Sequence, residues 1–309
     1  MKSYLKIIMY HYVRPLHNSR FSEIKGLDLK KFRNQLEYIE KNYEVITHKD
    51  VIDALNENKH LPKNSVWLTF DDGYKDHINF VLPLLEEFGY YGTFFPPAKP
   101  IKEGKLLDVN AIHHILAEVN NINSLLDLLK KEMENFGFIE KDWQHYWKTI
   151  DKSSRYDDPE VIFFKRLLQR ELPENIRTEI ISKIFEEIVN IKEADFAKNL
   201  YMSIDDLKVI ISRNHGVGSH TYSHRWLDSL NAVEQKKEVD ISIKFLEEIG
   251  VNTNNWMMCY PYGSYNKTTV DLLKVSNCCL GLTTNVGEAK LGTENRYSLP
   301  RYDTNDFPR

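Results

Sequence analysis

The sequence predicts an α/β fold in which βαβ units surround a parallel sheet, either open or closed into a barrel. Strand and helix signals alternate from about residue 5 to residue 95, and the alternation resumes after about residue 207. Between them, at about 105–200, strand signals are scarce, and Leu, Ile and Phe recur at helical spacing. We therefore expect residues 1–309 to form a single domain with a helical insertion at about 105–200.

Residue types locate the elements before the insertion. Val, Ile and aromatic residues mark strands, and apolar residues three and four positions apart mark helices. Asp28 suits a helix start because Asp caps free N–H groups, and Gly89 suits a helix end because Gly accepts a left-handed backbone. The expected strands are residues 5–12, 43–46, 66–70 and 92–95, and the expected helices are residues 29–39, residues 48–57 and a segment between Gly73 and Gly89.

The elements after the insertion restore the alternation. Helices are expected at 207–213 and 233–249, and strands at 216–219, 256–260, 278–283 and 297–302. The insertion itself is interrupted near Pro159 and Pro173. It is either a stabilising appendage or subunit contact, or a lid over a substrate.

Composition excludes several classes of protein. Hydrophobic residues make up 42% and charged residues 28%, as in ordinary globular chains, so a disordered or fibrous protein is excluded. The formal net charge of −4, without a basic run, predicts no nucleic-acid partner. No apolar run reaches the roughly 18 residues of a transmembrane helix, and the N-terminal apolar run is too short for a signal peptide. We therefore expect a cytoplasmic protein, and its oligomeric state stays open.

Two adjacent carboxylates stand at the end of a predicted buried strand, in the segment Thr69–Gly73 (TFDDG). Parallel α/β folds place their sites at the carboxyl ends of strands. Asp71 and Asp72 should point in different directions there, so that one can bind a metal while the other stays free as a base. Taken alone, the segment also fits a solvated turn completed by Gly73.

Two histidines follow another predicted strand, in His220–His224 (HTYSH). At positions i and i+4 they can reach one ion if the segment forms a turn of helix. Alone, such a pair is more typical of surface or core histidines. Combined with one carboxylate of TFDDG, it forms a two-histidine, one-carboxylate set that suits Zn²⁺ or a similar divalent ion.

Together the two segments resemble the motifs of the polysaccharide deacetylases, the carbohydrate esterase family 4 or NodB-homology group. TFDDG and H(S/T)xxH are both met without a mismatch and in the family's order. The chain most resembles the circularly permuted branch that includes poly-N-acetylglucosamine deacetylases, with Tyr10-His11, Tyr260–Gly263 (YPYG) and Leu299–Arg301 (LPR). The resemblance covers both ends of the chain and skips the insertion. It implies a distorted (β/α) barrel of the NodB-homology type.

The resemblance also implies roles for the matching residues. Asp71 would be the general base that activates the attacking water. Asp72, His220 and His224 would hold the divalent metal, Zn²⁺ in first place with Co²⁺ or Ni²⁺ as alternatives.

A general acid is implied at the N-terminus. Residues 5–11 (LKIIMYH) fit the spacing of the family motif LxIVLxH, which normally lies near the C-terminus. His11 would therefore protonate the leaving amine, as expected for the permuted branch. The less favoured alternative is that His11 is a satisfied histidine at the end of a buried strand.

The third family motif, RxPY, is only partly present. Pro261 and Tyr262 match it, but Cys259 stands where the motif has the arginine that steadies the catalytic aspartate. Arg301 of the LPR segment is the candidate replacement. Tyr262 would offer its backbone N–H to the oxyanion, and Pro261 and Tyr262 would contact the substrate. Cys259 is expected to be a small buried apolar residue, and no CxxC pair suggests a cysteine metal site.

Several other polar and aromatic residues have weaker claims. His113 and His114 are consecutive, so they cannot both face one ion from a helix, and we expect them to be solvated. His77 could lie near the site, although the motif does not require it. Trp226, two residues past His224, is expected to line the substrate groove. Three aromatic residues of the insertion are expected to form its core: Trp143, Tyr146 and Trp147.

The sequence thus predicts a metal-dependent hydrolase that removes an N-acetyl group from an amino sugar. Because no signal peptide is expected, the predicted substrate is an intracellular intermediate of surface-glycan biosynthesis, on a nucleotide or lipid carrier. One alternative is an O-acetyl or other amide hydrolase that uses the same site. The other is a catalytically silent carbohydrate-binding protein, which the missing motif arginine, the permuted acid and the large insertion would fit.

Overall fold

The computed structural model describes residues 3–17, 19–57, 60–291 and 296–308, which divide into two compact units. Unit 1 comprises Met1–His17, Gly26–Gly104 and Lys198–Arg309, and unit 2 comprises Asn18–Lys25 and Lys105–Ala197. Unit 1 contains all the motif residues described above. The short segment Asn18–Lys25 belongs to unit 2, which its sequence pattern did not predict.

A largely parallel sheet forms the centre of unit 1. Its strands are β1 (Ser3–Tyr10), β4 (Glu44–Val45), β5 (Ser65–Asp71), β6 (Gly92–Phe95), β7 (Gly216–Val217), β10 (Ala289–Leu291) and β11 (Tyr302–Asp303). The strand order is β10-β1-β5-β6-β7, in which only the β10–β1 pairing is antiparallel. β4 pairs with β5 and β11 pairs with β1, both in parallel. The predicted α/β architecture with a parallel sheet is therefore confirmed.

Two more parallel strand pairs accompany this sheet. β2 (Val13–Arg14) pairs with β3 (Leu27–Asp28), and β8 (Trp256–Cys259) pairs with β9 (Cys278–Leu282). Isolated bridges join Ser219, just after β7, to Met258 of β8, and Leu282 of β9 to Leu299.

The predicted strand at 297–302 is wrong over most of its length. Only Tyr302 lies in a regular strand, because the chain first bonds to β9 through Leu299 and then crosses to β1. A segment that changes its partner within a few residues cannot form a long ladder with either.

Alternation along the strands separates two apolar cores. In β5, Val66, Leu68 and Phe70 pack on one side of the sheet, against the apolar faces of surrounding helices. Trp67 faces the other side, with Phe95 of β6 and with residues of β8 and β9. Every residue of β5 is buried, so the polar residues at its end are positioned by a rigid strand.

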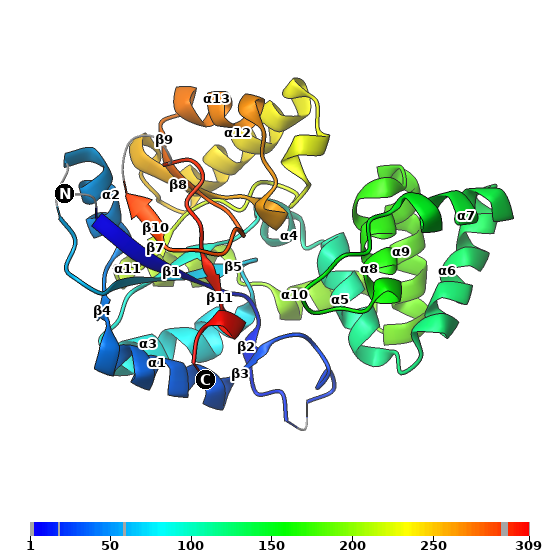
Figure 1. The fold of residues 1–309 in the computed structure, drawn as a ribbon, viewed down its shortest axis with the longest axis horizontal. Coiled ribbons are helices and arrows are strands. Elements are labelled where there is room, and N and C mark those ends of the chain that lie inside the picture. Colours follow the sequence, from blue (N-terminus) through cyan, green and yellow to red (C-terminus); the bar gives the residue numbers. More distant parts are fainter. Residues whose placement is uncertain (1–2, 18, 58–59, 292–295, 309) are drawn as a thin grey trace. The chain divides into compact units, whose positions relative to one another are not determined.

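Helices pack around the sheet of unit 1. They are α1 (Leu29–Asn42), α2 (His48–Glu57), α3 (Leu82–Glu87), α4 (Ala98–Glu103), α11 (Ile204–Ser212), α12 (Ala232–Glu248) and α13 (Lys267–Val275). Figure 1 shows α1 and α3 together on one side of the sheet and α12 beside α13 near β8 and β9. As predicted, Asp28 caps α1 by accepting from the backbone N–H of Lys30, and Gly89 follows α3 with φ of +68°.

Unit 2 is built from helices in the part that the structure describes. They are α5 (Asp108–Glu118), α6 (Ile122–Asn135), α7 (Glu140–Thr149), α8 (Pro159–Arg166) and α9 (Glu174–Val189), and α10 (Glu193–Leu200) crosses the boundary between the units. Phe163 is fully buried and contacts the rings of Trp143 and Trp147. Arg20 ties the segment Asn18–Lys25 to these helices by pairing with Glu118 at 2.6 Å.

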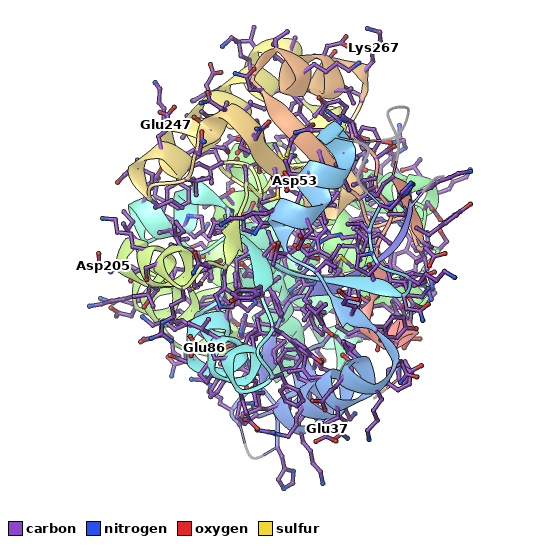
Figure 2. All side chains as sticks on the ribbon, turned by 90° about the vertical axis from the view of Figure 1, so that its left-hand side faces the viewer. Glu37, Asp53, Glu86, Asp205, Glu247 and Lys267 are labelled. Carbon is purple, nitrogen blue, oxygen red and sulfur yellow. The ribbon has the colours of Figure 1, made fainter. Side chains whose placement is uncertain are left out.

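The surface carries charges of both signs. Glu37, Glu247 and Lys267, on α1, α12 and α13, point outward in Figure 2. In the described ranges, none of the helices combines the length and the apolar character that crossing a bilayer requires.

Candidate active site

The end of β5 places the two adjacent carboxylates in different surroundings. Asp71 is the last residue of the strand and continues the side of Trp67 and Thr69. Asp72 leaves the strand with φ of +70°, a left-handed value that Asp tolerates better than most residues. Both residues are almost fully buried, at 1% and 2% exposure. Their oxygens therefore depend on protein partners, and the two sets of partners differ.

Arg301 holds the carboxylate of Asp71 with both terminal nitrogens. Nη1 donates to Oδ1 at 2.9 Å and Nη2 donates to Oδ2 at 2.7 Å, a bidentate pair in which both side chains are buried. The sulfur of Cys259 lies 3.1 Å from Nη2 of Arg301 and 3.4 Å from Oδ2 of Asp71. Cys259 is thus buried, as predicted, but it contacts the charged pair instead of serving only as apolar packing.

This pairing keeps Asp71 ionised. Burial alone would raise the pKa of its carboxyl group, but the positive potential of Arg301, with smaller contributions from His220 and His11, lowers that pKa to about 2. The carboxylate is therefore free to accept a proton at neutral pH.

Replacing Arg301 by Met should strongly destabilise the metal-free protein, because Asp71 would stay buried without its counter-charge. Removing one partner of a buried ion pair costs about 3–5 kcal/mol of unfolding free energy. The wild-type stabilisation is complete above the ordinary carboxyl pKa of 3.8 and is lost as the pH falls toward the folded-state value of about 2. The difference between the two proteins should therefore narrow below about pH 4, as urea unfolding near neutrality and near pH 3 would measure.

Lys236→Met is the matched control, because it breaks an exposed pair with Asp240 one helical turn away. Exposed pairs contribute little, so this variant should unfold like the wild type at both pH values. An Arg301→Met protein with wild-type stability near neutrality would contradict the importance of the buried pair.

Asp72 meets the two histidines of HTYSH. Nε2 of His220 lies 3.4 Å and Nε2 of His224 lies 3.3 Å from the same oxygen, Oδ1 of Asp72. Nδ1 of His220 lies 2.7 Å from the backbone carbonyl of Cys259, which requires the proton on Nδ1. The Nε2 atom that faces Asp72 is then the atom available as a ligand.

These three side chains fit a divalent ion. Oδ1 of Asp72 is buried and makes no hydrogen bond to any described residue, although two imidazole nitrogens face it. Burial would raise the pKa of Asp72, but the imidazoles of His220 and His224 lower it well below 3.8, so the oxygen is anionic. One carboxylate oxygen and two imidazole nitrogens are the donors that Zn²⁺ and similar ions accept.

A second cluster of potential ligands is less suitable for a cation. Asp71, His220 and Cys259 also bring one ligand atom each within 4.8 Å of one another. The guanidinium of Arg301, however, already binds the carboxylate and the sulfur of this cluster. A positive charge in that place disfavours a metal ion.

The two histidines converge through a loop and not through the helical turn that their spacing predicted. Thr221 and His224 have φ values of +64° and +59°, which a helix does not allow. The carboxylate of Glu238 in α12 holds the loop by accepting from the backbone N–H groups of Tyr222 and Ser223 at 3.0 and 2.8 Å. The helical geometry was wrong because spacing alone does not reveal a partner on a distant helix.

His11 lies directly after β1, beside Asp71. Its Nε2 is 3.9 Å from Oδ2 of Asp71, and its side chain is 38% exposed, so the ring lies near the buried carboxylate and is also accessible to solvent. Nε2 of the buried His77 donates to the backbone carbonyl of His11 at 2.9 Å. Burial lowers the pKa of His77 to about 4, so the ring is neutral. His77 therefore anchors the His11 backbone and is not part of the ligand set.

Two aromatic residues lie beside His224. The ring of Tyr262 stacks on Trp226 with centroids 4.3 Å apart and also contacts the edge of His224. Tyr262 has φ of +58° and follows the buried Pro261. The predicted substrate contacts Trp226, Pro261 and Tyr262 thus lie together next to the ligand set, and their role stays a prediction.

Sequence reasoning missed two residues that shape this site. Tyr74 directly follows TFDDG, and its hydroxyl donates to Oδ2 of Asp72 at 2.5 Å. Its position beside the motif was a usable signal. Glu238 is one of many acidic residues on a helix, and no pattern distinguished it.

His114 of unit 2 is buried and not solvated, contrary to prediction. Its ring packs edge-on against Phe21 and Phe196, and its Nδ1 donates to the carbonyl of Asn110 at 2.8 Å. Phe21 comes from the segment Asn18–Lys25, so the helix sequence alone could not reveal this contact.

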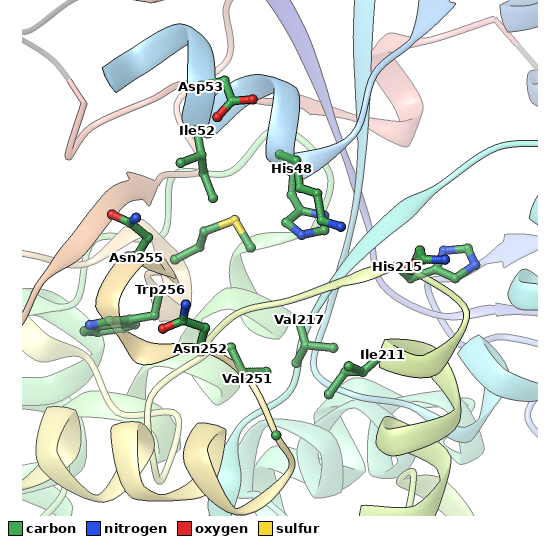
Figure 3. A pocket seen from close by; sticks show the side chains of 14 residues that line it. His48, Ile52, Asp53, Ile211, His215, Val217, Val251, Asn252, Asn255 and Trp256 are labelled. Carbon is green, nitrogen blue, oxygen red and sulfur yellow. The ribbon is translucent and has the colours of Figure 1, made fainter. Parts of the chain in front are cut away.

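A separate cavity of about 330 Å³ lies at the starts of β7 and β8 (Figure 3). His48, His215 and Trp256 contribute to its wall. The wall of this cavity includes none of the residues placed in the candidate site. The cavity is therefore not part of the site.

Comparison with known proteins identifies the family. The sequence model of the polysaccharide deacetylase family matches residues 58–140 and 189–278. Both TFDDG and HTYSH lie within the match, whereas His11 and Arg301 lie outside it. YxkH of Bacillus subtilis (strain 168), whose name describes a polysaccharide deacetylase, is 30% identical over 98 residues. That match covers 31% of this chain, and the chain spans only 33% of the length of YxkH.

Solved structures share the fold along nearly the whole chain. The deacetylase PplD from Streptococcus pyogenes, solved with acetate, has a TM-score of 0.61 at 18% identity, over 98% of this chain and 93% of its own. IcaB from Ammonifex degensii has a TM-score of 0.55 at 19% identity, over 97% and 91%. A de-N-acetylase from Aggregatibacter actinomycetemcomitans has a TM-score of 0.54 at 15% identity, over 98% and 96%. Since the family's sequence model matches more than half of its residues, the chain belongs to the polysaccharide deacetylase family.

Proposed function

We propose that the protein is a metal-dependent hydrolase that removes the acetyl group from an N-acetylated amino sugar. The observation that carries this proposal is the buried, unbonded oxygen of Asp72, which faces two imidazole nitrogens beside the ionised Asp71. Two of the similar structures, a deacetylase solved with acetate and a de-N-acetylase, agree with this chemistry.

Asp72, His220 and His224 would hold the ion, with Zn²⁺ as the first choice and Co²⁺ or Ni²⁺ as alternatives. When bound there, such an ion acidifies water and polarises the acetyl carbonyl. The remaining steps are carried out by side chains and backbone groups of this chain.

Asp71 takes one proton from water as the water oxygen attacks the carbonyl carbon. Arg301 holds the two oxygens of Asp71 in place and preserves its charge beforehand. The backbone N–H of Tyr262 donates a hydrogen bond to the developing oxyanion. The C–N bond then breaks, and His11 gives a proton to the nitrogen, which yields acetate and a free amine.

Two structural details of the proposal go beyond the family assignment. The 3.9 Å separation of His11 from Asp71 supports the acid at the N-terminus, as in the permuted branch. The bridges at Met258 and Leu299 support a sheet that continues around β8 and β9 toward a distorted barrel. The cytoplasmic location and the carrier-linked substrate stay predictions.

Acetate release is the direct test. Purified protein loaded with Zn²⁺ should release acetate from short oligomers of N-acetylglucosamine or from a nucleotide-linked N-acetylated sugar. Asp72→Asn should release none, because it removes the anionic ligand. Glu37→Gln, a change of the same kind on the exposed side of α1, is the control and should behave like the wild type.

The choice of acetylated compound decides between the alternatives. Release from an O-acetylated sugar but from no N-acetyl compound would replace the proposed amide hydrolysis by ester hydrolysis. A protein that loads with metal and retains the glycan without releasing acetate would be the silent carbohydrate-binding protein.

A further inference from the structure

Tyr74 binds one of the two carboxylate oxygens of Asp72 and leaves the other to the two histidines. Its hydroxyl donates to Oδ2 at 2.5 Å, and both residues are buried. Oδ1 is left to face the imidazoles of His220 and His224. A carboxylate without this restraint could turn about its last side-chain bond and present either oxygen, or both, to an ion.

The ring of Tyr74 is held firmly enough to impose this orientation. It stacks on Tyr12 with centroids 4.0 Å apart and planes 16° apart. The guanidinium of Arg14 lies over the Tyr12 ring, 4.9 Å from its centroid. The Tyr74 backbone forms a bridge to Tyr201. The hydroxyl therefore has little freedom to follow a moving carboxylate.

The backbone between the two residues is equally constrained. Gly73 has φ of +67°, and a Cβ at this position would lie 2.8 Å from Cβ of Pro96. Its carbonyl accepts from the N–H of Met202 at 2.9 Å. Only glycine fits here, and the turn that results brings Tyr74 back onto Asp72.

We propose that Tyr74 is a positioning residue that confines Asp72 to a single-oxygen ligand for the divalent ion. The inference rests on the metal site of the proposed function. An ion bound through one carboxylate oxygen and two imidazoles keeps positions open for water and substrate, which a carboxylate that used both oxygens would reduce.

Tyr74→Phe tests the proposal, because it removes the hydroxyl and leaves the ring in its stack. Partners that orient metal ligands typically contribute 10- to 100-fold to affinity, so the dissociation constant for Zn²⁺ should rise by about 10-fold or more. Competition with a chromophoric chelator measures this constant. Added Zn²⁺ should also raise the melting temperature of Tyr74→Phe by less than it raises that of the wild type. This second measurement is made on the folded variant, so it also shows that the variant folds.

Tyr10→Phe is the matched control. Tyr10 is fully buried, and its hydroxyl has no hydrogen-bond partner among the described residues, so its removal should leave Zn²⁺ affinity unchanged. Wild-type affinity in Tyr74→Phe, or an equal loss in both variants, would overturn the inference. A wild-type protein that binds no Zn²⁺ would instead overturn the proposed function, so the two failures are distinguishable.

Discussion

Asp71→Asn should lower kcat/KM for acetate release by about 10²- to 10⁴-fold, the usual contribution of a general base. The amide has nearly the same shape as the carboxylate, but it cannot accept the proton. Metal content should stay at the wild-type level, because Asp71 binds Arg301 and not the imidazole pair around Asp72. Steady-state acetate release and metal analysis on one preparation give both values.

The control for this variant is Asp271→Asn, the same change on an exposed carboxylate paired with Lys267. It should alter neither rate nor metal content. Because Asp71→Asn also leaves Arg301 without its counter-charge, the assay temperature is chosen from the unfolding curve of the variant. An Asp71→Asn enzyme with full activity would remove Asp71 from the role of base.

His220→Ala should lose both the metal and the activity. The variant removes one of the two imidazoles that face Asp72, together with the bond from Nδ1 to the Cys259 carbonyl. Metal content should fall from about one ion per chain to almost none, and acetate release should fall to the background rate. Metal analysis of protein purified without chelators measures the first effect.

His145→Ala, an exposed histidine in α7, serves as the comparison and should retain its metal and rate. A His220→Ala protein that keeps one ion per chain would place the metal elsewhere. A wild-type protein that contains no metal as purified and binds no added Zn²⁺ would exclude the proposed hydrolysis altogether.

The sequence was most informative where local pattern and structure coincide. The sequence predicted a buried strand that ends at Asp71 and Asp72, because the residue types of a strand are recognisable. It also predicted a site there, because functional sites lie at the carboxyl ends of parallel strands. The pairing of Arg301 with Asp71 could be suspected only through the resemblance to a family whose motif arginine is missing here. Nothing in the local sequence around residue 301 indicates its partner.

The features of the site that the sequence did not predict depend on distant contacts and on backbone strain. The approach of His220 to His224 needs left-handed residues and the support of Glu238, neither of which is encoded in the spacing of HTYSH. The burial of His114 depends on Phe21, from a segment that periodicity could not assign. In each case the deciding partner lies outside the window in which a sequence pattern operates.

The long separation between Asp71 and Arg301 has a consequence for synthesis on the ribosome. The two residues lie 230 positions apart, so the carboxylate of Asp71 is made long before its counter-charge. At the usual elongation rates the delay is about 10–50 s. During that interval the nascent chain carries an uncompensated acid at the end of an apolar strand. The buried ion pair can therefore form only once residue 301 has left the exit tunnel, and the carboxyl end of β5 gains its counter-charge at that point.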